Sequence, residues 1–126
     1  MIEGIRKGNS DKFIWKHNDV DHLEYLLKNS NKEQPKIVAF ESVYSMDGDF
    51  APIKKIIEVS KKYNALTYLD EVHGVGLYGK NGGGLSQQLG LTDEIDIIEG
   101  TLAKGFGLMG GYITAKSNII DVIRSF

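Results

Sequence analysis

The centre of the chain carries the stretch Ala65-Leu66-Thr67-Tyr68-Leu69-Asp70-Glu71-Val72-His73. Its first part is apolar, favours a strand and stops at an acid. The pattern predicts a buried strand that ends at Asp70, with His73 three residues later. Side chains that follow the end of a buried strand are well placed to line a ligand site.

A second stretch lies downstream: Gly100-Thr101-Leu102-Ala103-Lys104-Gly105-Phe106-Gly107. It follows a strand-like run, Ile95 to Glu99, and sets a single lysine between small residues. A lysine amine is a nucleophile only when it is deprotonated, and a cramped, partly desolvated site favours that form. The hydroxyl of Thr101 and the backbone amides between the glycines are suited to hold a phosphate.

Strand-like and helix-like segments alternate along the rest of the chain. We predict strands at Lys12 to Lys16, Ile37 to Phe40, Leu66 to Asp70, Ile95 to Ile98 and Gly110 to Ala115. We predict helices that end at Lys7, follow a cap at Asn18 or Asp19, begin near Pro52, and follow a cap at Ser117. Because the Ile37 to Phe40 run does not alternate, it is expected to be covered on both faces.

This order predicts the α/β class, with a mostly parallel sheet and helices on both faces. Ligands bind such sheets outside the carboxyl ends of the strands. Glu41, Asp70 and Thr101 each follow or close a predicted strand. We therefore expect these three residues to share one crevice.

Asp70, His73 and Lys104 are together the protein groups that a pyridoxal phosphate enzyme needs. An aspartate keeps the pyridine nitrogen protonated, so that the ring accepts an electron pair, and a lysine binds the cofactor and moves protons. Taken singly, they could be a surface lysine, a capping aspartate and a hydrogen-bonded histidine. A non-enzymatic α/β interaction module also stays open, but it would give these residues no role.

A dinucleotide-binding module is a further alternative. Gly74 to Gly79 matches G-x-G-x-x-G after a strand, and acids near the expected position are Asp93, Glu94 and Asp96. In that fold the glycines open a helix, whereas Gly79 to Gly84 continues with residues that disfavour one. We expect a mobile loop there instead.

Composition limits the function classes further. The 126 residues suffice for one compact domain, and a net charge of -2 without a basic block argues against nucleic acid as a partner. The apolar runs are too short to cross a bilayer. There is no cysteine, and His17 and His22 do not share a helical face, so we expect no metal. Met1 to Ser10 has no apolar signal core.

The chain resembles the α-oxoamine synthases, which are fold type I (aspartate aminotransferase-like) pyridoxal phosphate enzymes. The segments that carry the resemblance are Glu41 to Ile53, Asp70 to His73 and Gly100 to Gly107, with support from Met1 to Arg6 and His17 to Asp19. The resemblance implies that residues 1–126 are part of the large cofactor-binding domain, without its N-terminal part and the C-terminal small domain. Gly74 and Gly105 stand where many relatives have alanine, which loosens the backbone there.

The resemblance also implies a role for each candidate residue. The implied cofactor-binding residues are Lys104, Asp70, His73, Ser45 and Thr101. Among them Lys104, Asp70 and His73 would also be catalytic: Lys104 would transfer protons and Asp70 would hold the pyridine nitrogen. His73 and Ser45 would lie near the phenolic oxygen, and Thr101 would bind the phosphate. Glu41 would contact the substrate or the cofactor, or only cap a turn.

Within the family the chain most resembles the acyltransferase that condenses glycine with succinyl-CoA in the first step of one route to haem. That resemblance implies a homodimer, in the cytoplasm of a bacterium or in the mitochondrial matrix of a eukaryote. Glycine C-acetyltransferase and 8-amino-7-oxononanoate synthase stay alternatives, because the acyl-CoA pocket lies largely outside this chain. By itself, the segment is expected to be inactive.

Overall fold

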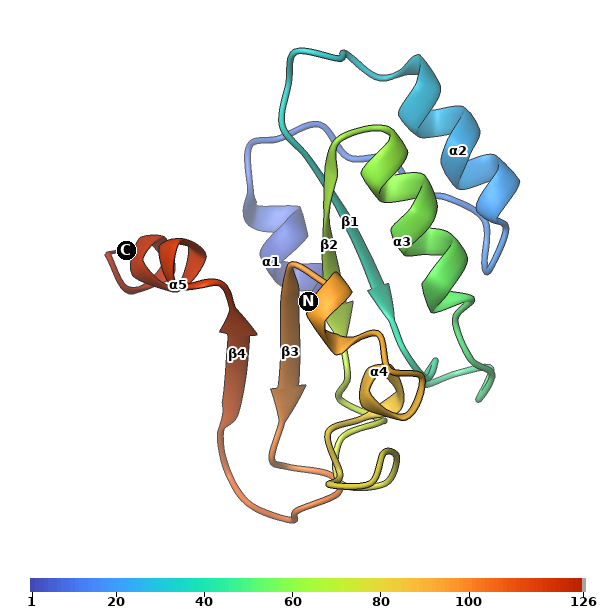
Figure 1. Cartoon of the computed structure of the whole chain (residues 1–126). Coiled ribbons are helices and arrows are strands. Elements are labelled where there is room, and N and C mark those ends of the chain that lie inside the picture. The colour runs from blue at the N-terminus through green and yellow to red at the C-terminus, as the bar shows by residue number, and fades with distance from the viewer. Residues whose placement is uncertain (126) are drawn as a thin grey trace.

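The structure, a computed structural model, describes residues 1–125 (Figure 1). Four strands form one sheet: β1 (Lys36–Glu41), β2 (Ala65–Asp70), β3 (Ile97–Thr101) and β4 (Gly111–Ala115). The longer helices are α1 (Ile2–Lys7), α2 (Val20–Asn29), α3 (Ile53–Lys62) and α5 (Ser117–Arg124). Two short helical turns, α4 (Leu85–Gln88) and the 3-10 helix η1 (Thr92–Glu94), lie between β2 and β3.

The sheet has the strand order β1-β2-β3-β4. The first three strands are parallel, and β4 pairs antiparallel with β3. The prediction of an α/β fold with a mostly parallel sheet is therefore confirmed. Because β1, β2 and β3 run in the same direction, their carboxyl ends lie at one edge of the sheet.

One face of the sheet carries the hydrophobic core, and α2 and α3 cover it (Figure 1). Helix α3 contributes Ile53, Ile56 and Ile57, none of which is more than 1% exposed, and their spacing places them on one side of the helix. Helix α2 begins after Asp19, whose carboxylate accepts a hydrogen bond of 2.9 Å from the backbone N of His22. Of the two predicted caps, Asp19 is confirmed.

The second face of the sheet is only partly covered within residues 1–125. Ile37 on β1 is 61% exposed and Leu66 on β2 is 41% exposed. Helix α1 lies on this side (Figure 1), and the amino group of Met1 is 3.9 Å from Oε1 of Glu99. Helices thus lie on both faces, as predicted. The expectation that the Ile37 to Phe40 run is covered on both faces is wrong for the described residues, because burial alternates along β1.

Several predicted element bounds are also wrong. Lys12 to Lys16 forms no strand, and Ile14 in it is 92% exposed, because no strand within residues 1–125 lies beside it to pair with. Strand β3 begins at Ile97 rather than at Ile95. Ser117 is the first residue of α5 and not its cap. The short α4 and η1 were not predicted, since such short helices show no periodicity.

The glycine-rich segment after β2 does not open a helix. Gly74 to Gly79 forms turns, and α4 begins only at Leu85. The backbone N atoms of Asn81 and Gly83 donate to Oε1 of Gln87, each over 3.0 Å. A dinucleotide fingerprint needs a helix directly after its glycines, and that context is missing from the described chain. No helix within residues 1–125 is long and apolar enough to span a membrane.

Candidate active site

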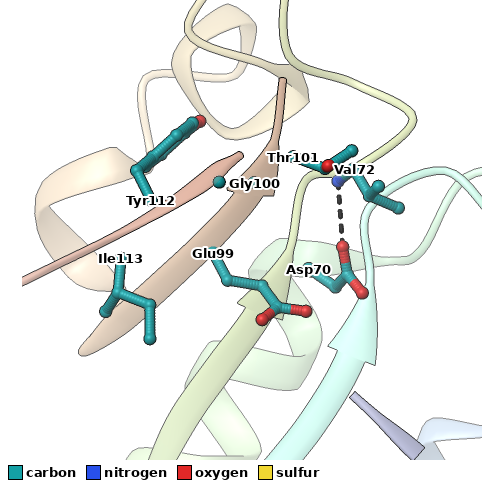
Figure 2. Close-up of a pocket in the computed structure, with 8 residues that line it drawn as sticks. Asp70, Val72, Glu99, Gly100, Thr101, Tyr112 and Ile113 are labelled. Atoms are coloured by element: carbon teal, nitrogen blue, oxygen red, sulfur yellow. Dashed lines mark hydrogen bonds between the residues drawn. The ribbon is translucent and has the colours of Figure 1, made fainter. Parts of the chain in front are cut away.

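Three carboxylates form a row across the edge where β1, β2 and β3 end. The strand register pairs Glu41 with Asp70 and Asp70 with Glu99. Residues that are paired in register point to the same face of the sheet, so these side chains are neighbours. Figure 2 shows Asp70 and Glu99 at this edge, and the hydroxyl of Tyr68 donates to Oε2 of Glu99 over 2.6 Å.

Asp70 is 7% exposed, and its burial and the two neighbouring carboxylates change its acidity. Burial raises the pKa of Asp70 to about 6, and the carboxylates of Glu99 and Glu41 also raise it. A hydrogen bond of 2.9 Å from the backbone N of Val72 to Oδ1 acts in the opposite direction. A positively charged group bound in the site would therefore stabilise the ionised form of Asp70.

The Asp70 carboxyl is expected to titrate near pH 6 when NMR follows the ligand-free chain. Between 3.8 and about 6 the folded state keeps a proton that the unfolded state has released. The free energy of unfolding should therefore fall as the pH rises through this window. Glu99→Gln removes a neighbouring charge and should move the midpoint to lower pH. A midpoint at the ordinary value of 3.8 in both proteins would contradict this account.

Lys104 lies at the same edge, in the loop after β3. Its Nζ contacts Nε2 of His73. The other ring nitrogen of His73, Nδ1, is 3.7 Å from Oε2 of Glu41. The same carboxylate oxygen accepts a hydrogen bond of 3.1 Å from the backbone N of Ser45. Lys104, His73, Glu41 and Ser45 thus form one continuous set of contacts.

Asp70 and Thr101 belong to a neighbouring cavity of ≈ 560 Å³ (Figure 2). Its other lining residues are Val72, Glu99, Gly100, Gly111, Tyr112 and Ile113. The hydroxyl of Thr101 donates to the carbonyl of Gly110 over 3.2 Å and accepts from the backbone N of Ala103 over 3.3 Å. The structure therefore brings the candidate residues to one edge of the sheet, in two adjacent groups.

An exposed cluster ties the segment before α2 to the loop after β1. Nε2 of His17 is 2.9 Å from Oδ2 of Asp49 and 4.0 Å from Oδ2 of Asp47. The hydrogen bond with Asp49 raises the pKa of His17. Ligand atoms of these three residues lie within 4.8 Å of one another. Because all three are exposed and His17 already contacts a carboxylate, the cluster is explained as a link between the two segments.

Two acids in this region were not assigned by the sequence analysis. Alternation along β3 puts Glu99 on the same face as Thr101. The cross-strand register, which the sequence does not show, places it beside Asp70. Glu71 is completely buried, and no local pattern marks it. Its backbone partners Leu85 and Ser86 are 14 and 15 residues away along the chain.

A family model for aminotransferases of class I and II matches residues 1–126. The chain is 61% identical to 5-aminolevulinate synthase 2 from Cereibacter sphaeroides, over 99% of the chain. It is 58% identical to 5-aminolevulinate synthase from Rickettsia conorii, over 98% of the chain. The chain spans only 31% and 30% of the lengths of these two relatives.

Solved structures show the same arrangement of strands and helices. A serine palmitoyltransferase from S. paucimobilis with a bound PLP-myriocin aldimine superimposes with a TM-score of 0.92, at 36% identity. The match covers 98% of this chain and 31% of that one. An 8-amino-7-oxononanoate synthase from Francisella tularensis gives a TM-score of 0.84 at 22% identity over 99% of this chain and 35% of that one, and supports the fold alone. These neighbours confirm the predicted fold class.

Proposed function

The chain belongs to the aminotransferase class I and II family, and we propose that it is part of a 5-aminolevulinate synthase. This enzyme condenses glycine with succinyl-CoA to give 5-aminolevulinate, CoA and CO2 on a route to haem. Residues 1–126 would be the core segment of the large cofactor-binding domain, since the chain spans 31% of its relative from Cereibacter sphaeroides. The segment alone is expected to be inactive.

Sequence identity supports this member of the family over the alternatives. Eight bacterial relatives that carry the name 5-aminolevulinate synthase are between 54% and 61% identical to the chain. Identity falls to 36% for the serine palmitoyltransferase and to 22% for the 8-amino-7-oxononanoate synthase. Glycine C-acetyltransferase and 8-amino-7-oxononanoate synthase are the alternatives, because the same site residues would serve them.

The contact between Nζ of Lys104 and Nε2 of His73 is the observation that carries the proposal. It lies at the edge where Asp70 lines a cavity. Nδ1 of His73 is buried without a hydrogen-bond partner in residues 1–125. An amine, an imidazole and a buried carboxyl at one sheet edge fit pyridoxal 5'-phosphate.

When bound, the cofactor supplies an electron sink for the carbanion at the glycine α-carbon. Lys104 would hold it covalently through Nζ and would accept and return the α-proton. Since Oδ1 of Asp70 accepts from Val72, Oδ2 would accept from the protonated ring nitrogen. His73 and Ser45 would lie near the phenolic oxygen, Thr101 near the phosphate, and Glu41 would orient His73.

Glycine, succinyl-CoA and a second copy of the chain are the proposed partners of the complete enzyme. The homodimer follows from the resemblance to the α-oxoamine synthases. A cytoplasmic location is proposed because the relatives from Cereibacter sphaeroides and Rickettsia conorii are bacterial proteins.

The test is an acyl-CoA competition with the complete protein, loaded with pyridoxal phosphate and supplied with glycine. We expect succinyl-CoA to exceed acetyl-CoA in kcat/KM by about 10²-fold or more, since a site that binds a carboxylate rejects an analogue without one. The measurements are CoA release and identification of the product. A preference for acetyl-CoA would instead indicate a glycine C-acetyltransferase. A preference for a longer acyl chain would point to the other members of the family.

A further inference from the structure

Glu71 directly follows β2 and is 0% exposed. Its carboxylate accepts three hydrogen bonds. Oε2 accepts from Oγ of Ser42 over 2.6 Å and from the backbone N of Leu85 over 3.1 Å. Oε1 accepts from the backbone N of Ser86 over 2.7 Å. A completely buried carboxylate is costly unless its oxygens are satisfied, and here both are.

The three donors are neutral, and two of them are backbone N–H groups that cannot reverse their role. They require an acceptor at each of the two oxygen positions. A glutamine would turn its NH2 group toward a backbone N–H or toward Ser42 and lose at least one bond. Space is equally restricted, because a Cβ at Gly84 would lie 2.5 Å from Cδ of Glu71. The pocket is therefore built for a carboxylate.

Glu71 also connects the segments that carry the candidate site residues. Its backbone N donates to the carbonyl of Glu99 on β3 over 2.8 Å. Its carbonyl accepts from the backbone N atoms of Gly74 and Val75, each over 2.8 Å, which closes the turn that carries His73. Through Ser42 its side chain reaches the end of β1. One residue thus contacts the end of β1, the middle of β3 and the turn after β2.

The side chains of Asp70 and Glu71 lie on opposite sides of the chain. Adjacent residues in an extended chain point to opposite faces. Since the Glu71 side chain is fixed on the side of Ser42 and α4, the Asp70 side chain is directed to the other side, where it lines the cavity. Loss of the Glu71 side-chain bonds is therefore expected to disturb both Asp70 and the turn that carries His73.

We propose that Glu71 is a positioning residue, which holds Asp70 toward the cofactor ring and His73 toward Lys104 through its bonds to Ser42 and to the start of α4. The link to the cofactor rests on the proposed function. The orientation of Asp70 does not, and it can be measured without any cofactor.

The experiment compares Glu71→Gln with wild type in the complete protein. In the cofactor-free form, NMR follows the titration of Asp70, whose pKa is raised by burial and by Glu99 and Glu41. We expect Glu71→Gln to move this midpoint toward the ordinary value of 3.8, because Asp70 turns toward water. In the same variant, the affinity for pyridoxal phosphate should fall about 10- to 100-fold, the factor for one hydrogen bond to a charged group.

Glu58→Gln is the matched control, since it makes the same change at an exposed position on α3. It should leave the Asp70 midpoint and the cofactor affinity unchanged. If Glu71→Gln does not fold, Ser42→Ala decides: it removes one of the three bonds and should shift both readouts in the same direction by a smaller amount. Wild-type values in the folded variant would overturn the proposal. If wild-type protein binds no pyridoxal phosphate, the proposed function fails, while the Asp70 titration still tests the role of Glu71.

Discussion

Lys104→Ala is expected to abolish covalent capture of pyridoxal phosphate by the complete protein. In wild type the amine lies against His73 at the sheet edge, so borohydride reduction should place the label on Lys104, as read by peptide mapping. The variant should show no label above background. Turnover should fall by about 10³-fold or more, because the general base, which contributes about 10²- to 10⁴-fold by itself, is lost together with the covalent bond.

Lys116→Ala is the control for this experiment, because Lys116 is another exposed lysine of the same chain. It should keep the label on Lys104 and the activity. Since Lys104 is itself exposed, the free energy of unfolding should change by no more than about 0.5 kcal/mol in the Lys104→Ala protein. Label spread evenly over many lysines of the wild type would mean that Lys104 is not the attachment site.

The sequence was sufficient to predict that the candidate residues gather at one edge of the sheet. Glu41, Asp70 and Thr101 close strands that the sequence shows as apolar runs, and parallel strands bring such ends to one edge. The structure adds the cross-strand register, which places Glu99 beside Asp70. The local pattern was enough to place Glu41, Asp70 and Thr101, because each of them closes or follows a strand that the sequence predicts.

The sequence did not predict features that depend on distant partners. Phe13 and Ile14 look strand-like, but no strand lies beside Lys12 to Lys16 to pair with it. Ile37 belongs to an apolar run that predicts a strand covered on both faces, yet Ile37 is 61% exposed. Glu71 is an acid, a residue type that favours the surface, and its bonds to Ser42 and to α4 explain why it is buried. Each of these features depends on contacts with residues that are distant in the sequence, or on the lack of such contacts within residues 1–125.

Asp70→Asn should show separately what Asp70 contributes to activity and what its burial costs in stability. Asparagine keeps the side-chain volume and can still accept from the backbone N of Val72, but it cannot balance a protonated ring nitrogen. Loss of one partner from a buried charged pair costs about 2–5 kcal/mol, so kcat/KM of the complete enzyme should fall by about 30-fold to several thousand-fold. Asp93→Asn changes an exposed acid in η1 and should have no effect.

The same substitution should stabilise the cofactor-free protein. The raised pKa of Asp70, about 6, means that at pH 7 the folded state holds an ionised carboxyl that burial and Glu99 disfavour. Asparagine removes that cost, so the variant should unfold at a higher temperature than wild type above pH 6 and should lose this advantage below pH 4. A residue kept for function at the expense of stability gives effects of opposite sign. If Asp70→Asn lowered both the activity and the stability of the cofactor-free protein at pH 7, Asp70 would be a structural residue.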